Sequence, residues 1–214
     1  RLGRLRVAAP VEESVTPRRR GLEQREGEPF RAERPARERF ERLEVEGLTY
    51  SHPGTSDGLR GVSFAVERGE FVVVTGRIGS GKTTLLRVLL GMLPKEGGEV
   101  RWNGRVVDDP ASFFVPPRSA YTSQVPRLFS DSLRENVTLG RDLTDAEVQE
   151  ALELAVLAPD VAAMQAGLET EVGARGVRLS GGQVQRAAAA RMLLQDAELL
   201  VFDDISSALD VDTE

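Results

Sequence analysis

The sequence contains no cysteine among its 214 residues, so disulfide bonds and thiolate metal sites are excluded. It also lacks any run approaching the ~18 apolar residues that a membrane-spanning helix needs. The chain begins at Arg1, without an initiator Met or a signal-peptide pattern. From these absences we expect the chain to be a fragment of a longer polypeptide.

Lysine is nearly absent, since Lys82 and Lys95 are the only two and arginine supplies the other side-chain positive charges. A lysine that is retained in such a sequence indicates a place where a compact ammonium group is needed. The single histidine, His52, stands beside Pro53 and is interpreted as an exposed loop residue.

Residues 1–42 show no sustained helical or strand period and contain Pro10, Pro17, Pro29 and Pro35. Eleven arginines and seven glutamates occupy residues 1–40, where they largely alternate without interleaved aromatic residues. A basic segment could contact a membrane surface or nucleic acid, but this pattern favours a solvated linker or tail. We therefore expect no nucleic-acid partner.

Residues 43–214 predict one α/β domain, because a chain of this length with 40% hydrophobic residues can bury the core of one medium domain. Short β-like runs at 43–50 and 62–66, and the hairpin signal Asn103-Gly104, predict an antiparallel patch. The apolar run 71–74 predicts a further strand, which leads into a glycine-rich turn.

Three helices and one more strand follow from local signals. Residues 82–93 form an apolar helical run that stops at Pro94. Capping-box patterns that begin at Thr144 and at Ser180 open helices that extend to about residue 157 and to residue 194. The continuous apolar run 198–202 predicts the next parallel strand of the core sheet.

The glycine-rich turn matches G-x-x-x-x-G-K-[ST] between the predicted strand and helix, which is the context that this motif requires. Its glycines let backbone N–H groups approach phosphate oxygens, and the helix start adds a favourable dipole. Lys82 supplies a point charge, and the Thr83 hydroxyl can ligate Mg²⁺. The sequence thus predicts a site for a nucleoside triphosphate with Mg²⁺, formed by Gly76, Arg77, Ile78, Gly79, Ser80, Gly81, Lys82, Thr83 and Thr84.

The carboxylate that accompanies such a loop is expected at the end of a nearby apolar strand. Residues 199–202 are that strand, and Asp203 follows them directly. We predict that Asp203 holds Mg²⁺ through its water shell.

Leu179 is followed by Ser180, Gly181, Gly182 and Gln183, and this run lies between the phosphate loop and Asp203. The chain therefore resembles the ABC ATPase family, which carries LSGGQ in the same place. The resemblance implies a phosphate-loop NTPase core with a mainly parallel sheet, an antiparallel β subdomain and a helical subdomain at about 125–185, truncated at the C-terminus of the domain 43–214. It also implies a head-to-tail dimer with a second ABC ATPase domain, in which the LSGGQ helix start faces the γ-phosphate held by the partner.

The resemblance assigns further roles. Tyr50 stands where the family stacks an aromatic ring on adenine. Gln124 resembles the Q-loop glutamine, which reaches Mg²⁺ and the attacking water and relays contact to the membrane domain. Residues 206–210 resemble the D-loop, which crosses the dimer interface.

Two segments resemble exporters within the family, namely residues 128–137 and residues 170–176. The second has Ala174 where exporters carry an acidic residue, which weakens any charged contact there. In exporters the membrane domain commonly precedes the ATPase domain in one polypeptide. Residues 1–42 would then be the connector from the last membrane helix, and the domain would lie at the cytoplasmic face of the cell membrane.

Asp204 occupies the position where active members of the family usually have a glutamate that acts as the general base. An aspartate is one methylene shorter, and a misplacement of ~1 Å can reduce a rate on the order of 10²-fold. The pattern resembles the subunit of a heterodimeric exporter that holds ATP at a slow site and lends its LSGGQ segment to the partner. The alternative is a homodimer that tolerates aspartate.

Two other function classes remain. DNA-repair ATPases share the phosphate loop and LSGGQ but insert a long coiled coil, whereas only about 55 residues separate Gln124 from Leu179 here. A non-hydrolysing ATP-dependent regulator or structural dimer is kept open by Asp204. The chain also ends before the place of the family's switch histidine, so we expect this fragment alone to be inactive or weak.

Overall fold

The computed structural model describes residues 38–203, except residues 56 and 174–175. One sheet is antiparallel and has the strand order β2-β1-β3-β4. Its strands are β1 (Arg42–Ser51), β2 (Gly58–Glu67), β3 (Gly97–Trp102) and β4 (Arg105–Val106). The predicted antiparallel patch is therefore confirmed, and both β runs at 43–50 and 62–66 fall inside its strands.

The turn between β3 and β4 is the predicted tight hairpin. Asn103 and Gly104 have φ values of 51° and 78°, and Trp102 pairs with Arg105 on either side of them. Two consecutive positive φ values are typical of a type I′ turn, whose twist matches that of the flanking strands. The Asn103 side chain also accepts hydrogen bonds from the amides of Glu41 and Arg42 at 2.8 and 3.0 Å, which ties the turn to the start of β1.

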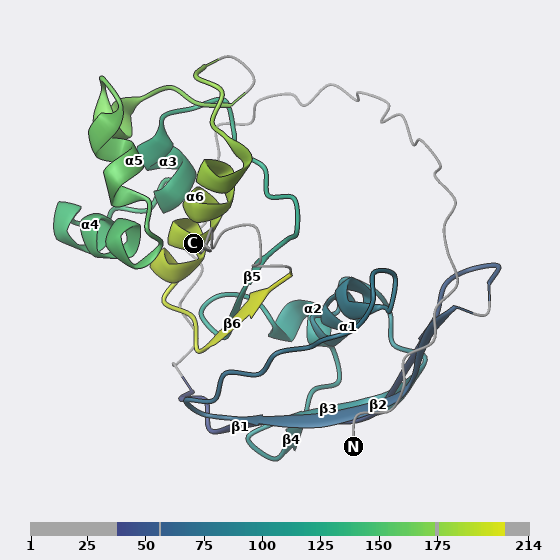
Figure 1. The fold of residues 1–214 in the computed structure, drawn as a ribbon. Coiled ribbons are helices and arrows are strands. Elements are labelled where there is room, and N and C mark those ends of the chain that lie inside the picture. Colours follow the sequence, from purple (N-terminus) through teal and green to yellow (C-terminus); the bar gives the residue numbers. More distant parts are fainter. Residues whose placement is uncertain (1–37, 56, 174–175, 204–214) are drawn as a thin grey trace, which may run out of the picture.

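Helix α1 (Lys82–Leu89) lies over the antiparallel sheet, together with α2 (Pro110–Phe113) (Figure 1). Leu85, Val88 and Leu89 pack into a core with the inward side chains of β1 and β3. The helix ends four residues earlier than predicted, because Gly91 takes a φ of 73°. A Cβ at Gly91 would lie 2.2 Å from the amide nitrogen of Ala111, so this position also permits the close approach of α2.

A second, parallel sheet consists of β5 (Ser119–Thr122) and β6 (Leu199–Phe202), paired in register from Ser119↔Leu199 to Thr122↔Phe202. The predicted parallel strand before Asp203 is thus confirmed. The strand predicted at 71–74 is wrong for the described part of the chain, where no strand pairs with it and Phe71 is 83% exposed. An apolar sequence forms a strand only where a neighbour completes its backbone hydrogen bonds.

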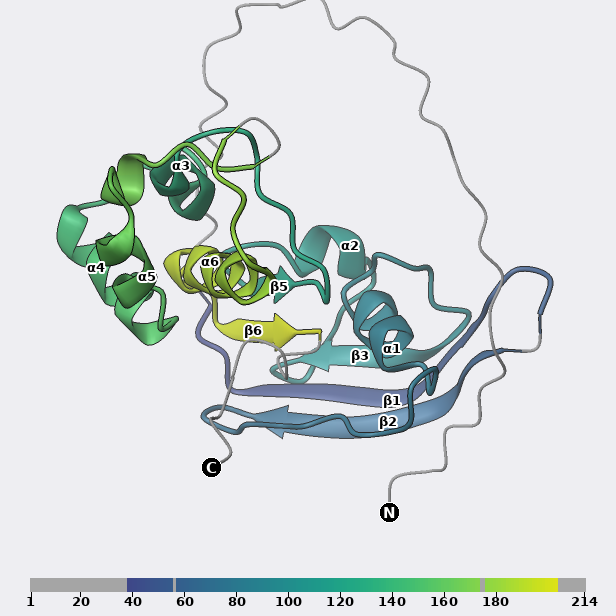
Figure 2. The same ribbon diagram turned by 45° about the horizontal axis from the view of Figure 1, so that its top comes forward.

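The remaining helices gather on the far side of the parallel pair from the antiparallel sheet (Figure 1 and Figure 2). They enclose a second core, which includes Leu133, Val148, Leu157 and Ala187. The capping boxes predicted at Thr144 and Ser180 are both present. The elements are α3 (Leu133–Thr138), α4 (Asp145–Leu154), α5 (Ala158–Ala163), the 3-10 turn η1 (Gly167–Glu169) and α6 (Gly181–Leu194).

Helix α6 joins the two parts of the molecule, because it packs against α3 and α4 and also against β5. Thr122 of β5 donates a long hydrogen bond of 3.5 Å from its hydroxyl to the carbonyl of Ala188 on α6. None of the helices in the described ranges is both long enough and apolar enough to cross a membrane.

Candidate functional site

The glycine-rich turn before α1 closes around the ammonium group of Lys82. Lys82 Nζ donates to the carbonyls of Gly76 and Arg77 at 3.0 and 3.1 Å. Gly79 and Gly81 have φ values of 77° and 87°, a backbone conformation that residues with a Cβ rarely adopt. The positive charge of Lys82 is therefore held against the backbone of the loop.

The start of α1 is chemically suited to an anion. Its N-cap residue, Gly81, has no side chain to accept from the first helical amides, and the first turn contains no acidic residue. These amides have no acceptor within the helix and point toward the loop, where the helix dipole favours negative charge. The Ser80 hydroxyl is buried without a hydrogen-bond partner. A phosphate group would supply the acceptors that this cradle lacks.

Asp203 directly follows β6 and is only 5% exposed. Each of its carboxylate oxygens accepts a hydrogen bond from one hydroxyl group. Thr83 of α1 donates to Oδ1 at 2.9 Å, and Tyr121 of β5 donates to Oδ2 at 3.1 Å. Burial, followed by the negative charge of Asp203, raises the pKa of the Tyr121 phenol. The structure thus brings together Thr83 and Asp203, whose oxygens are of the type that Mg²⁺ prefers.

Tyr121 belongs to no motif, and sequence reasoning missed it. The only signal was its place in the strand immediately before Gln124, at a position whose side chain could face the neighbouring strand end.

Gln124 follows β5 by two residues and is exposed. Because β5 and β6 are parallel and end in register, Gln124 and Asp203 leave the sheet at the same edge. Gln124 thus lies at the same sheet edge as Asp203, and its role in the site stays a prediction.

Tyr50 is 6% exposed and packs in the main core, which leaves no open ring face for an adenine base. The ring of His52 stands edge-on to it, with the two ring centroids 5.0 Å apart. His52 Nε2 lies 3.3 Å from the hydroxyl of Thr84 on α1. His52 therefore lies beside the first turn of α1 and is partly buried, whereas the sequence predicted an exposed loop residue.

Ser180 caps the start of α6, and its side chain accepts from the amide of Gln183 at 3.2 Å. The Gln183 side chain accepts from the amide of Ser180 at 2.9 Å and donates to Asp160 at 2.9 Å. The other carboxylate oxygen of Asp160 accepts from Arg186 Nε and Nη2 at 3.1 and 2.8 Å. Asp160 of α5, which no sequence motif indicated, therefore anchors the segment.

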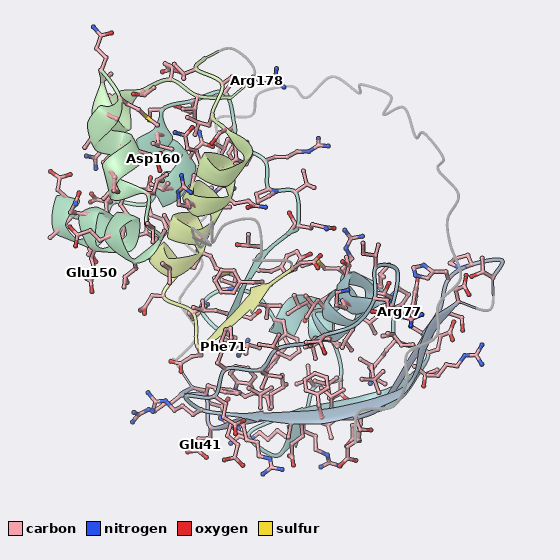
Figure 3. All side chains as sticks on the ribbon, in the orientation of Figure 1. Glu41, Phe71, Arg77, Glu150, Asp160 and Arg178 are labelled. Atoms are coloured by element: carbon pink, nitrogen blue, oxygen red, sulfur yellow. The ribbon has the colours of Figure 1, made fainter. Side chains whose placement is uncertain are left out.

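This segment and the phosphate loop lie in separate parts of the chain. Figure 3 shows Arg178, two residues before Ser180, far from Arg77 of the loop. The structure does not bring Ser180, Gly181, Gly182 and Gln183 to Lys82 within one chain.

The two exporter-like segments lie side by side. Leu133 donates its amide to the carbonyl of Thr170 at 2.9 Å, and Val172 donates to the carbonyl of Asp131 at 2.9 Å. The buried side chain of Asn136 binds the amide and carbonyl of Phe129 at 2.7 and 3.0 Å, which shapes the loop before α3. Ala174, Asp204 and residues 206–210 lie outside the described residues.

Comparisons with known proteins agree with this geometry. The family model described as ABC transporter matches residues 59–207. A probable multidrug resistance ABC transporter ATP-binding/permease protein, YheI, of Bacillus subtilis (strain 168) is 39% identical over 78% of this chain and 29% of its own length. The ATP-dependent lipid A-core flippase of Burkholderia orbicola (strain AU 1054) is 38% identical over 91% of this chain and 33% of its own length.

A solved structure of a bacterial Atm1-family ABC exporter with ATP bound shares the fold, with a TM-score of 0.72 and 32% identity. That match covers 80% of this chain and 30% of the exporter chain. The chain spans about a third of the length of the curated relatives described above. It belongs to the ABC transporter family, as an ATP-binding domain whose relatives include exporters.

Proposed function

We propose that the chain binds and hydrolyses ATP as the motor domain of an ABC exporter. The observation that carries this proposal is the hydrogen bond between Thr83 and Asp203, beside a loop whose backbone carbonyls bind the Lys82 ammonium group. This arrangement joins an anion cradle to a buried carboxylate. It suits a triphosphate accompanied by a divalent cation.

Each group has a defined part in that activity. The amides at the start of α1 and the Lys82 ammonium hold phosphate oxygens and balance their charge. Thr83 and Asp203 would hold Mg²⁺, which supplies further charge neutralisation on the phosphates when bound. Gln124, at the same sheet edge, orients the attacking water, and the residue at 204 accepts its proton.

The second half of the site comes from another chain. Ser180, Gly181, Gly182 and Gln183 would not reach the ATP that Lys82 holds in the same chain, because nearby Arg178 lies far from Arg77 of the loop (Figure 3). A head-to-tail dimer would bring this helix start to the partner's γ-phosphate. ATP would then act as the contact between two ATP-binding domains.

The two sites of that dimer are unequal in this proposal. Asp204 is shorter than the glutamate that usually serves as the base, so the site built on Lys82 turns over slowly. The partner is then a non-identical chain with a glutamate, to which this chain lends its own LSGGQ segment. A dimer that binds ATP without hydrolysis is the competing function.

The remaining parts follow from the relatives, whose names join ATP-binding to permease. We propose that transmembrane domains belong to the same polypeptide, with residues 1–42 as connector and residues 43–214 as ATP-binding domain at the cytoplasmic face. Residues of about 125–185 would form the helical subdomain. Their second core, separate from the core under α1, supports this division.

Equilibrium binding of a fluorescent ATP analogue with Mg²⁺ tests the proposed site. Lys82→Ala should weaken binding on the order of 100-fold, because the charged ammonium group that would hold phosphate oxygens is lost. Lys95→Ala is the matched control, since Lys95 also donates to a backbone carbonyl, that of Gly98 at 3.0 Å, and should bind normally. Equal affinities of the two variants would refute the phosphate-loop assignment.

Single-site turnover in the complete transporter tests the unequal dimer. Asp204→Glu should raise hydrolysis at the site that contains Lys82. Unchanged hydrolysis there would contradict the impaired base. If neither site hydrolyses ATP while both still bind it, the result would favour the regulatory dimer instead.

A further inference from the structure

Both carboxylate oxygens of Asp203 accept a hydrogen bond, although the sequence motifs explain only the one from Thr83. Its Oδ1 faces Thr83, the predicted Mg²⁺ ligand. Its Oδ2 accepts from the Tyr121 hydroxyl at 3.1 Å, from a different strand. A carboxylate with a donor on each oxygen cannot rotate about its Cβ–Cγ bond without breaking a hydrogen bond. The orientation of the oxygen beside Thr83 therefore depends on Tyr121.

Burial raises the pKa of the Tyr121 phenol, and the nearby positive charge of Arg87 acts in the opposite direction. Because the Asp203 carboxylate accepts the hydrogen bond, the phenol proton points to its Oδ2. Arg87 stands four residues after Thr83, which puts both side chains on one face of α1. Thr83 of α1 and Tyr121 of β5 are thus linked through the two carboxylate oxygens of Asp203.

The position of this path favours a role in the site over a role in the core. Tyr121 is half-buried, and its ring packs against the main core, but its hydroxyl ends on the carboxylate at the sheet edge. Packing needs only the ring, which phenylalanine would supply equally well. The hydroxyl is needed for orientation of Asp203.

We propose that Tyr121 is a positioning residue that aims Asp203 at the Mg²⁺ shared with Thr83 and so sets the affinity of the site for Mg²⁺. This inference rests on the proposed ATP site. Residues that orient metal-binding side chains commonly contribute 10- to 100-fold to metal affinity. Tyr121 is not itself a ligand of Mg²⁺. Loss of its hydroxyl should therefore weaken Mg²⁺ binding without removing the phosphate cradle.

The test titrates Mg²⁺ into the 214-residue chain with a fluorescent ATP analogue, after affinity has been measured in EDTA. Tyr121→Phe should raise the Mg²⁺ midpoint about 10-fold and leave the affinity in EDTA within about twofold of the unsubstituted chain.

Thr122→Val is the matched control, since it also removes one hydroxyl from β5. The Thr122 hydroxyl faces Ala188 and Met192 of α6 instead of Asp203. This variant should keep the Mg²⁺ midpoint of the unsubstituted chain. Thermal unfolding of all variants checks that the fold is retained.

Each result has a separate meaning. A Mg²⁺ midpoint of Tyr121→Phe equal to that of Thr122→Val would overturn the positioning role while leaving the ATP site intact. An equal loss of affinity with Mg²⁺ and in EDTA would also overturn it, since the defect would then be structural. An unsubstituted chain that binds no nucleotide in either condition would refute the proposed function and this inference with it.

Discussion

Helices α1 and α6 begin with similar sequences, but only α6 has a side-chain cap on its first amides. Both starts are glycine-rich, and neither has an acidic residue in its first turn. Gly81, at the start of α1, has a φ of 87° and offers no cap, whereas Ser180 has a φ of −65° and forms a complete capping box with Gln183. The first amides of α1 are thus left without a side-chain cap, whereas the start of α6 is completed by its own side chains.

This difference supports the proposal that one chain serves two half-sites. A helix start that binds phosphate has no side-chain cap on its first amides, because a cap would compete with the ligand for them. A helix start that is offered to another chain must hold its shape before that chain arrives. The links from Gln183 and Arg186 to Asp160 provide that shape.

The largest expected effect on this comparison comes from Asp160→Ala. It removes a half-buried carboxylate and leaves Arg186 and Gln183 without their acceptor, so the free energy of unfolding should fall by about 2 kcal/mol. Glu169→Ala, which removes an exposed partner of Arg134, should cost at most about 0.5 kcal/mol. Urea unfolding measures both, and ATP binding at Lys82 should be normal in each. Equal losses of stability would show that Asp160 does not anchor α6.

A paired serine substitution separates the two helix starts. Ser180→Ala removes a cap and should lower the free energy of unfolding by about 1 kcal/mol without ATP. Ser80→Ala removes a buried hydroxyl that has no partner, so it should cost no stability while weakening ATP binding. Unfolding and binding measurements on both variants check the pair. A destabilised Ser80→Ala would mean that the phosphate loop is completed from within.

The smallest expected effect concerns the cap of α4, which serves as a reference for a helix start without a ligand. Hydrogen bonds from the Thr144 side chain and then its backbone amide lower the pKa of Glu147 from its usual 4.5. A lowered folded pKa stabilises the fold above pH 4.5, and the contribution is lost as the pH falls through the folded value. Unfolding measured across this window should therefore depend less on pH in Glu147→Gln. An identical pH dependence in that variant would argue against the cap.

Local features of the site could be predicted from the sequence because their causes lie within a few residues. The capping boxes at Thr144 and Ser180 and the turn at Asn103-Gly104 each depend on side chains and backbone angles at fixed short spacing. The phosphate loop is similar, since its glycines and Lys82 are contiguous. The capping boxes and the turn appear where the sequence predicted them, and the glycine-rich run directly precedes α1.

Long-range features could not be predicted, since they depend on which elements pack together. Tyr50 and His52 are two aromatic residues in one stretch, and only the packing of β1 decides which ring is buried and which lies near Thr84. Tyr121 contacts Asp203 because β5 pairs with β6, and no motif records that pairing. The run 71–74 is apolar enough for a strand, but apolarity does not supply a partner.

The contrast between α1 and α6 is tested most directly by hydrogen exchange of backbone amides, with and without ATP and Mg²⁺, at a concentration where ultracentrifugation shows single chains. The account predicts that ATP slows exchange at residues 76–85, where the ligand supplies the missing acceptors, and leaves residues 180–185 unchanged. Protection of residues 180–185 in single chains, or no protection at residues 76–85, would contradict it.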